Sequence, residues 1–196
     1  NNCWQLDKWF SDPEKFGGGT LLDNGAHILD LTRQFMGEVV ECQGYAVTFH
    51  HDIQPLEDNG FGLFRFENDR VAFVQSSWTE WNDYMFSEIY GSDGFLRINN
   101  RMPESKLIHG ESEGAQTVYD FSKLGPTSYD DEMDAYLRAI REGERPHPTG
   151  FDGLRAVEMA HGIYEATKTE GRVSLRTEDS PLNEIGRASC RERVYC

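Results

Sequence analysis

Apolar positions follow a helical period in three parts of the chain. The segment TLLDNGAHILDLTRQFMG starts with Thr20, which can cap a helix together with Asp23 three residues later, and it ends at Gly37. Helical spacing returns in SYDDEMDAYLRAIREGERP, where acidic residues crowd the first turn, and again from about Phe151 to Thr169. We therefore predict one helix near the start of the chain and two near its end.

Between these helices, residues 38–124 have the β-branched and aromatic composition of strands. VVECQGYAVTF comes first, and the turn signals ENDR, GSDG and GESEG then divide FGLFRFENDRVAFVQSSWTEW, FSEIYGSDGFLRINN and SKLIHGESEGAQTVYDF. Three successive hairpins without a helical period between them predict antiparallel pairing. RVSLR, after the last helix, predicts one more short strand.

The order of these elements predicts the fold class. A helix, several strands, two helices and a final strand make an α+β arrangement, because α/β folds alternate strands and helices along the chain. We expect an open, mostly antiparallel β-sheet with helices packed on one face.

Charge restricts the class of partner. The 196 residues include 34 acidic and 19 basic side chains, a formal net charge of −15 at pH 7. Nucleic acids and anionic membranes bind basic surfaces, so neither is an expected partner. No apolar run is long enough to span a bilayer. The first residues, NNCWQLDKWF, carry neither a signal pattern nor an initial Met, which indicates a fragment.

The end of the chain differs in character from the rest. From Glu184 to Val194 it reads as the in-frame translation of a widely used DNA sequencing adapter. We therefore assign residues 1–183 to one domain and residues 184–196 to a non-native tail. Cys3 and Cys42 then remain. Two cysteines in an acidic, aromatic-rich chain indicate a reducing compartment without a disulfide framework, and we expect a cytoplasmic protein.

The stretch GGGTLLDNGAHILDL holds the candidate chemistry. On a helix, three polar side chains of this stretch and one that follows it fall within about 60° of arc, namely Asp23, His27, Asp30 and Gln34. Such a stripe can be a solvated face with i,i+4 pairs, or the face of an active site. The glycines around it are easier to understand if another backbone or a ligand comes close. An Asp beside a His can also orient the imidazole as a general base.

This stretch resembles the signature of the Gfo/Idh/MocA oxidoreductases, the glucose–fructose oxidoreductase and inositol dehydrogenase group. Their second domain carries a Gly-rich turn followed by Asp-x-x-x-His on a helix. FRFENDRVAFVQSSW, EIYGSDGFLRI, DEMDAYLRAIREGERPHPTGFDGLRAVEMAHGIYEAT and GRVSL also resemble family segments, in family order. The resemblance covers about Trp9 to Arg176 and implies the C-terminal domain of a two-domain NAD(P)-dependent oxidoreductase.

By this resemblance, Asp23 and His27 match the catalytic pair of the family. It implies that His27 takes the hydroxyl proton of a sugar or polyol substrate as hydride leaves the same carbon for the nicotinamide, while Asp23 holds the imidazole. Asp30 matches a position that contacts the substrate in some members. The resemblance also implies a homodimer or homotetramer formed through the sheet face.

Two family features are absent from the chain. One is the Glu-Lys-Pro segment, whose Lys shares the proton chemistry. The other is a dinucleotide fingerprint, because GGGTLL and GFGLFR lack a third glycine and do not join a strand to a helix. NAD or NADP is therefore expected mainly on an N-terminal Rossmann domain outside this chain, and the fragment alone is expected to be inactive.

Two other functions are compatible with the resemblance. Some members of the superfamily are NAD-dependent glycosidases, which oxidise, eliminate, hydrate and reduce again without net cofactor turnover. The other alternative is a non-catalytic domain that only mediates assembly through its sheet.

Other side chains carry weaker signals. His50 and His51 are expected in a strand, where they would point to opposite faces, and no Cys or Glu spacing supports a zinc site with His27, so no metal is expected. Trp78, Trp81 and Tyr84 fit a sugar-stacking wall and a packed aromatic cluster equally well.

Overall fold

The computed structural model describes residue 9 and residues 12–81, 85–99, 106–111, 114–121 and 128–175. The chain divides into two compact units. The first combines the segment up to Thr79 with the segment from His147 onward, and the second is Glu80–Pro146. The tail expected at residues 184–196 lies outside the described residues. None of the helices in the described ranges is long and apolar enough to cross a membrane.

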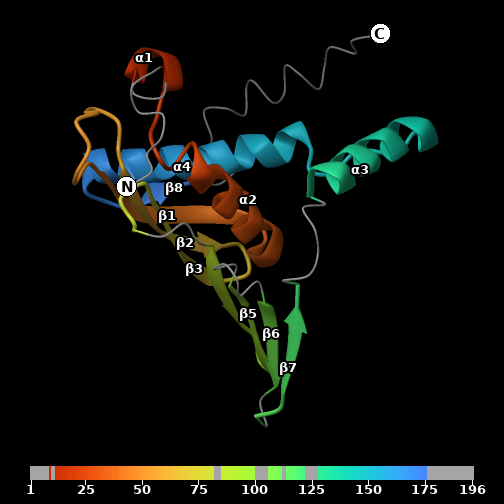
Figure 1. Ribbon diagram of the computed structural model, residues 1–196. Helices are drawn as coiled ribbons and strands as arrows, with labels where there is room; N and C mark the ends of the chain where they lie inside the picture. The colour runs from red at the N-terminus through yellow and green to blue at the C-terminus, as the bar shows by residue number, and fades with distance from the viewer. Residues whose placement is uncertain are drawn as a thin grey trace. The chain divides into compact units, whose positions relative to one another are not determined.

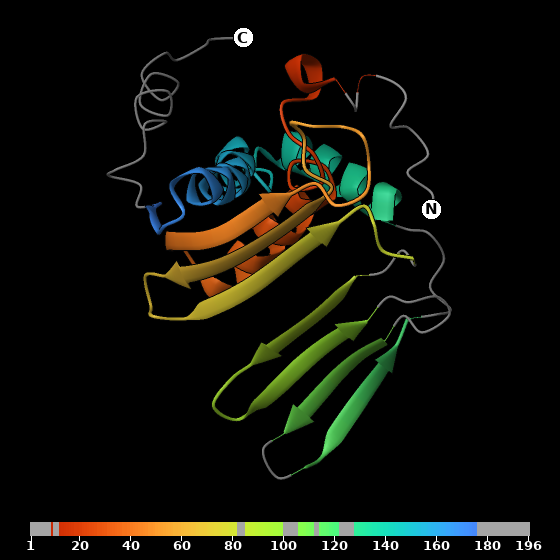
Figure 2. The ribbon, with the colours of Figure 1, turned by 90° about the vertical axis from the view of Figure 1, so that its left-hand side faces the viewer.

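The first unit is a two-layer arrangement of helices on one sheet. Its antiparallel strands lie in the order β3-β2-β1-β8. Helix α2 packs against β3, α4 packs against β1, and both helices contact each other on the same face of the sheet (Figure 1, Figure 2). The strands are β1 (Val39–Val47), β2 (Asn59–Phe66), β3 (Val71–Ser77) and β8 (Val173–Ser174), and the helices are α1 (Pro13–Phe16), α2 (Asn24–Met36) and α4 (Gly150–Thr169).

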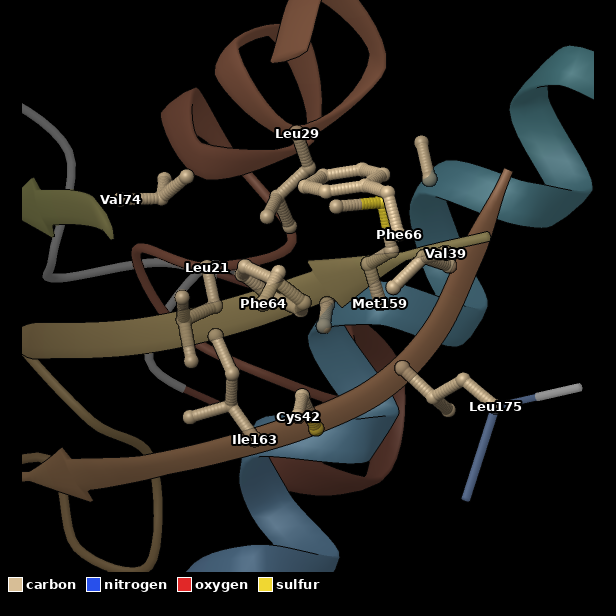
Figure 3. Packing of buried hydrophobic residues seen from close by; sticks show 12 residues of the cluster. Leu21, Leu29, Val39, Cys42, Phe64, Phe66, Val74, Met159, Ile163 and Leu175 are labelled. Carbon is tan, nitrogen blue, oxygen red and sulfur yellow. The ribbon is translucent and has the colours of Figure 1, made fainter. Parts of the chain in front are cut away.

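The core of this unit lies between the helices and the sheet (Figure 3). Leu29 of α2, Phe64 and Phe66 of β2, and Met159 and Ile163 of α4 are all fully buried. The two Phe residues are two positions apart on a strand and the two α4 residues are one turn apart, so each element turns a single face inward. Burial of each such side chain contributes about 1.5–3 kcal/mol, and it holds α2 firmly on the sheet.

The opposite face of the same sheet carries exposed apolar side chains. Pairing places Tyr45 of β1 beside Phe61 of β2, and Leu63 of β2 beside Phe73 of β3. Tyr45, Phe73 and Leu63 are 66%, 64% and 47% exposed. These four residues are named the outer apolar face below.

The second unit contains a second antiparallel sheet, in the order β4-β5-β6-β7. Strands that follow one another in sequence are neighbours in this sheet, as the hairpin signals predicted. The elements are β4 (Phe86–Tyr90), β5 (Gly94–Asn99), β6 (Lys106–Glu111), β7 (Gln116–Asp120) and the helix α3 (Ser128–Glu142).

The α+β class and the antiparallel pairing are confirmed, with helices packed on a sheet. The strands within the described residues are nevertheless divided between two four-stranded sheets, whereas the sequence pattern suggested one. Turn signals identify which neighbouring strands pair, but they carry no information on whether β3 and β4 belong to the same sheet.

Candidate active site

A glycine-rich loop, residues 17–23, leads into α2 and is fixed by one buried carboxylate. Glu57 is 4% exposed and accepts hydrogen bonds from the backbone N–H groups of Gly19 and Leu21, both at 2.9 Å. The Tyr164 hydroxyl on α4 donates to the same carboxylate at 3.0 Å. Burial, together with the negative charge of Glu57, raises the pKa of Tyr164 above its usual range. Bonds from N–H groups to a carboxylate are stronger than neutral ones, so the loop is anchored at its centre.

The glycines of this loop permit that close packing. A Cβ on Gly19 would lie 1.8 Å from the backbone carbonyl oxygen of Glu57, and a Cβ on Gly18 would lie 2.4 Å from the Tyr164 hydroxyl. The neighbour that explains these glycines is therefore the protein's own backbone and side chains.

The same contacts test whether the loop fits a dinucleotide. The backbone N–H groups of residues 19–23 all donate within the protein, to Glu57 or to the Gly19 carbonyl. A phosphate site at a helix start needs N–H groups that point at the ligand. The loop therefore does not fit the pyrophosphate of NAD or NADP.

Helix α2 begins later than its sequence pattern suggested. Asn24 is its first residue and Asp23 is the N-cap residue, so the prediction that Thr20 caps the helix was wrong. Thr20 is fully buried, and its hydroxyl lies 2.7 Å from the Ser76 hydroxyl on β3. Ser76 also donates to the Thr20 carbonyl at 3.1 Å. A partner on the sheet thus replaces the local capping role of Thr20, and it ties the loop to β3.

Asp23 is half-buried between α2 and the end of β3. Its carboxylate makes no capping hydrogen bond to the helix. Instead Oδ2 accepts a hydrogen bond of 3.1 Å from the indole N–H of Trp78. Trp78 itself stacks on Phe16, with ring centroids 6.4 Å apart. This contact joins a residue of the predicted catalytic pair to an aromatic residue whose role the sequence left open.

His27 lies in the first turn of α2, four residues after Asp23, and its side chain is exposed. Within the part of the chain that the structure describes, no hydrogen bond to the His27 ring is found. The roles of Asp23 and His27 as a catalytic pair therefore stay a prediction. The position supplies what a general base needs first, which is access from solvent.

Asp30 lies one turn further along α2 and is engaged on the helix itself. Its Oδ2 accepts from the Gln34 amide at 2.7 Å, which is an i,i+4 pair of the solvated-face type. Its Oδ1 lies 3.9 Å from Arg33 and is buried without a hydrogen-bond partner in the described structure. The substrate contact predicted for Asp30 stays a prediction, and Oδ1 is the atom with acceptor capacity left.

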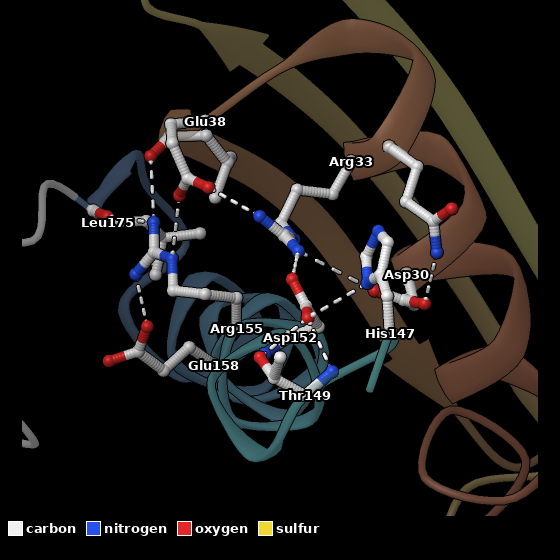
Figure 4. A network of polar contacts seen from close by, with 11 residues as sticks. Asp30, Arg33, Glu38, His147, Thr149, Asp152, Arg155, Glu158 and Leu175 are labelled. Carbon is white, nitrogen blue, oxygen red and sulfur yellow. Dashed lines mark hydrogen bonds and ion pairs between the residues drawn. The ribbon is translucent and has the colours of Figure 1, made fainter. Parts of the chain in front are cut away.

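A buried ion network, which sequence reasoning missed, holds the other end of α2 (Figure 4). Arg33 pairs with Glu38 and with Asp152 at the start of α4. Arg155, 1% exposed, bonds Glu38 and also donates to the carbonyls of Val39 and Leu175. The Thr149 hydroxyl and backbone N–H, followed by Arg33, lower the pKa of Asp152 to about 2. The network links α2, α4 and β1, so α2 is fixed at both ends.

His50 and His51 lie in an irregular loop after β1, so their expected place in a strand was wrong. Asp58 imposes this path, because its carboxylate accepts the backbone N–H groups of Phe49, His50 and His51 at 2.8–2.9 Å. Among the described residues, no three His, Cys, Asp or Glu side chains come together in a way that could hold a metal ion.

The three aromatic candidates separate in the structure. Trp78 packs on Phe16 and bonds Asp23, which places it inside an aromatic cluster. Trp81 is 81% exposed, and Tyr84 lies outside the described residues.

The helices on an open antiparallel sheet define the chain as an α+β domain. Levoglucosan dehydrogenase in complex with NADH and levoglucosan has this fold, with a TM-score of 0.79 at 20% identity over 88% of this chain and 56% of that chain. An oxidoreductase from Agrobacterium radiobacter, in complex with NAD+, L-tartaric acid and magnesium, gives a TM-score of 0.75 at 17% identity over 89% and 53%.

The sequence comparisons match a known family. Residues 1–97 match the model of the GFO/IDH/MocA C-terminal domain, which is the domain that the resemblance indicated. It is 24% identical over 169 residues to myo-inositol 2-dehydrogenase of Thermotoga maritima, covering 82% of this chain and 50% of the relative. It is also 24% identical over 169 residues to D-xylose 1-dehydrogenase (NADP(+)) 2 of Haloferax volcanii, covering 84% and 50%. The chain thus spans about half the length of these relatives.

Proposed function

We propose that this chain is the substrate-binding and catalytic half of an NAD(P)-dependent oxidoreductase that acts on a sugar, a polyol or a related cyclic hydroxyl or keto compound. The match to the family model supports the reaction class, and the names of the relatives, inositol and xylose dehydrogenases, support the substrate class. NAD or NADP accepts the hydride in this proposal. A further domain would hold the cofactor, since the loop 17–23 does not fit it.

The observation that carries the proposal is the placement of His27. It is exposed in the first turn of a helix that is otherwise rigidly fixed, by Glu57 at its entry and by Arg33 at its far end. A proton acceptor must keep its position relative to the substrate to within fractions of an ångström. An exposed imidazole on a doubly anchored helix meets this requirement better than one on a free loop.

The proton step uses groups of this chain alone. A neutral His27 ring accepts the proton of the substrate hydroxyl, and Asp23, four residues earlier, orients that ring in this proposal. In this proposal the Asp30 carboxylate accepts a hydrogen bond from a second hydroxyl of the substrate, which requires the buried Oδ1 to become accessible or Oδ2 to leave the Gln34 amide. A polyhydroxylated ring offers such a second donor.

The test is turnover of the full-length enzyme with the variant His27→Ala. General-base catalysis contributes typically about 10²–10⁴-fold, so kcat is expected to fall by that factor, while the affinity for NAD or NADP barely changes. His50→Ala, which alters an exposed histidine outside the polar stripe, is the matched control and should keep parental turnover. Near-parental turnover of His27→Ala would return α2 to the solvated-face interpretation. Accumulation of NADH or NADPH distinguishes the dehydrogenase from the glycosidase alternative, which shows product without net cofactor turnover.

A second role, assembly, is favoured by the outer apolar face. Large exposed apolar patches on soluble proteins mark interaction sites, and Tyr45, Leu63 and Phe73 form such a patch on a two-sided sheet. We propose that two copies of the chain associate through this face, as a homodimer or within a homotetramer.

A further inference from the structure

Asp23 occupies a position in which its side chain would normally serve the helix. Asp is among the strongest N-cap residues, and the N-cap carboxylate usually accepts the backbone N–H of the second or third helical residue, here Gly25 or Ala26. Gly25 N–H instead donates to the Thr20 carbonyl at 2.8 Å, and the Asp23 side chain makes no capping bond. The Asp23 backbone, with φ −83° and ψ −100°, lies outside the extended region of a typical capping residue, and a side-chain contact elsewhere holds the carboxylate away from the helix.

The group that does so is the indole of Trp78. Its Nε1–H donates to Asp23 Oδ2 at 3.1 Å. Trp78 is itself held in place, because its backbone N–H donates to the Asp58 carbonyl at 2.8 Å and its ring stacks on Phe16 with an interplanar angle of 25°. Two residues earlier on the same segment, Ser76 bonds Thr20. Residues at the end of β3 and just after it thus bond the loop before α2 twice, through Ser76 with Thr20 and through Trp78 with Asp23.

We propose that Trp78 is a positioning residue, which withholds the Asp23 carboxylate from the helix N-terminus and so keeps it available to orient His27. The proposal rests on the proposed catalytic roles of Asp23 and His27. A Trp suits this task because indole Nε1–H is a donor only and does not exchange its proton with the carboxylate at neutral pH. With Oδ2 occupied by the indole, Oδ1 is the oxygen left for the imidazole.

The first test reads the contact directly and needs no catalysis. Trp78→Phe keeps an aromatic ring on Phe16 but removes the N–H, so the freed Asp23 carboxylate should turn to the Ala26 amide. In ¹⁵N–¹H spectra of the chain, the Ala26 amide should then move downfield and exchange more slowly, and Asp23→Ala in the same background should abolish both changes. Trp81→Phe, which removes the N–H of an exposed indole, is the matched control and should leave the Ala26 signal in place. An unchanged Ala26 amide in Trp78→Phe overturns the proposal.

The second test asks whether the contact serves the reaction. In the full-length enzyme, Trp78→Phe should lower kcat by about 10-fold or more, as expected for a misplaced catalytic group, with KM within about two-fold of the parent and a nearly unchanged Tm. A purely structural role would lower Tm and leave kcat of the folded fraction as it was. Parental kcat together with a capped Ala26 amide also overturns the proposal, while His27 can still be essential. If the parent enzyme oxidises no sugar or polyol, the proposed function fails, and the amide experiment still decides whether Trp78 holds Asp23.

Discussion

Single buried carboxylates organise the loops around the candidate site. Asp58 is fully buried and collects three successive backbone N–H groups, from Phe49, His50 and His51. Burial by itself would raise the pKa of Asp58, but these donors outweigh it and lower the pKa from 3.8 to about 2. The ionised form therefore stabilises the folded state.

The pH dependence of stability checks this role. A lowered pKa contributes stability that is complete above the ordinary pKa and is lost as the pH falls toward the folded value. Asp58→Asn should lower the free energy of unfolding at pH 7 by about 2 kcal/mol or more. The difference from the parent should narrow between about pH 4 and pH 2. Urea denaturation across this pH range measures the difference in unfolding free energy. Asp52→Asn, which changes an exposed Asp in the same loop, is the control. A difference that stays constant with pH would contradict the assignment.

At the scale of elements, the entry of α2 depends on a glycine that touches another backbone. The Gly19 position leaves no room for a Cβ, because the Glu57 carbonyl oxygen would be 1.8 Å away. Gly153 on α4 contrasts with it, since it is exposed in a helix and a Cβ there would meet nothing within 4 Å.

Paired substitutions test the difference between these glycines. Gly19→Ala must displace backbone, so it should destabilise the chain by about 2 kcal/mol or more. Gly153→Ala should stabilise the chain by about 0.5–1 kcal/mol, because Ala is the better helix former and reduces the entropy of the unfolded chain. Chemical denaturation of both variants measures the change in the free energy of unfolding, which should be negative for Gly19→Ala and positive for Gly153→Ala. Equal effects of the two changes would show that the contact with Glu57 does not constrain the loop.

Local patterns predicted the elements well and their partners poorly. The period in SYDDEMDAYLRAIRE located α3, and the segment from Phe151 to Thr169 located α4 to within one residue. The polar stripe of α2 was also visible, because i,i+4 spacing is local. The groups that set its geometry were not, since Glu57 and Trp78 lie 38 and 55 residues from their partners Gly19 and Asp23. The spacing of apolar and polar residues along the chain does not predict a contact over such a separation. Thr20 shows the same effect. Its hydroxyl, which the local sequence predicted to cap the helix, bonds Ser76, 56 residues away.

For the whole molecule, the outer apolar face makes a prediction about assembly. Phe73→Lys puts a charge within this face and should shift a dimer toward monomer in sedimentation velocity, without lowering Tm by more than a few degrees, since the side chain is 64% exposed. Phe49→Lys, at a 70% exposed Phe outside this face, should leave the sedimentation profile unchanged. A parent chain that stays monomeric at high concentration would exclude association through this face.

The discontinuous first unit has a consequence for biosynthesis. Its sheet strands β1, β2 and β3 are translated first. Helix α4, which supplies Met159 and Ile163 to the core, and Leu175, directly after β8, follow only after Glu80–Pro146 has been translated. At about 5–20 residues per second, Phe64 and Phe66 wait about 5–20 seconds for their packing partners on α4, although Leu29 of α2 is already present. The meander of the second unit pairs only neighbouring strands, so it can form during that interval. The nascent chain thus exposes an apolar sheet surface for a defined time, in which a chaperone has its best opportunity to bind.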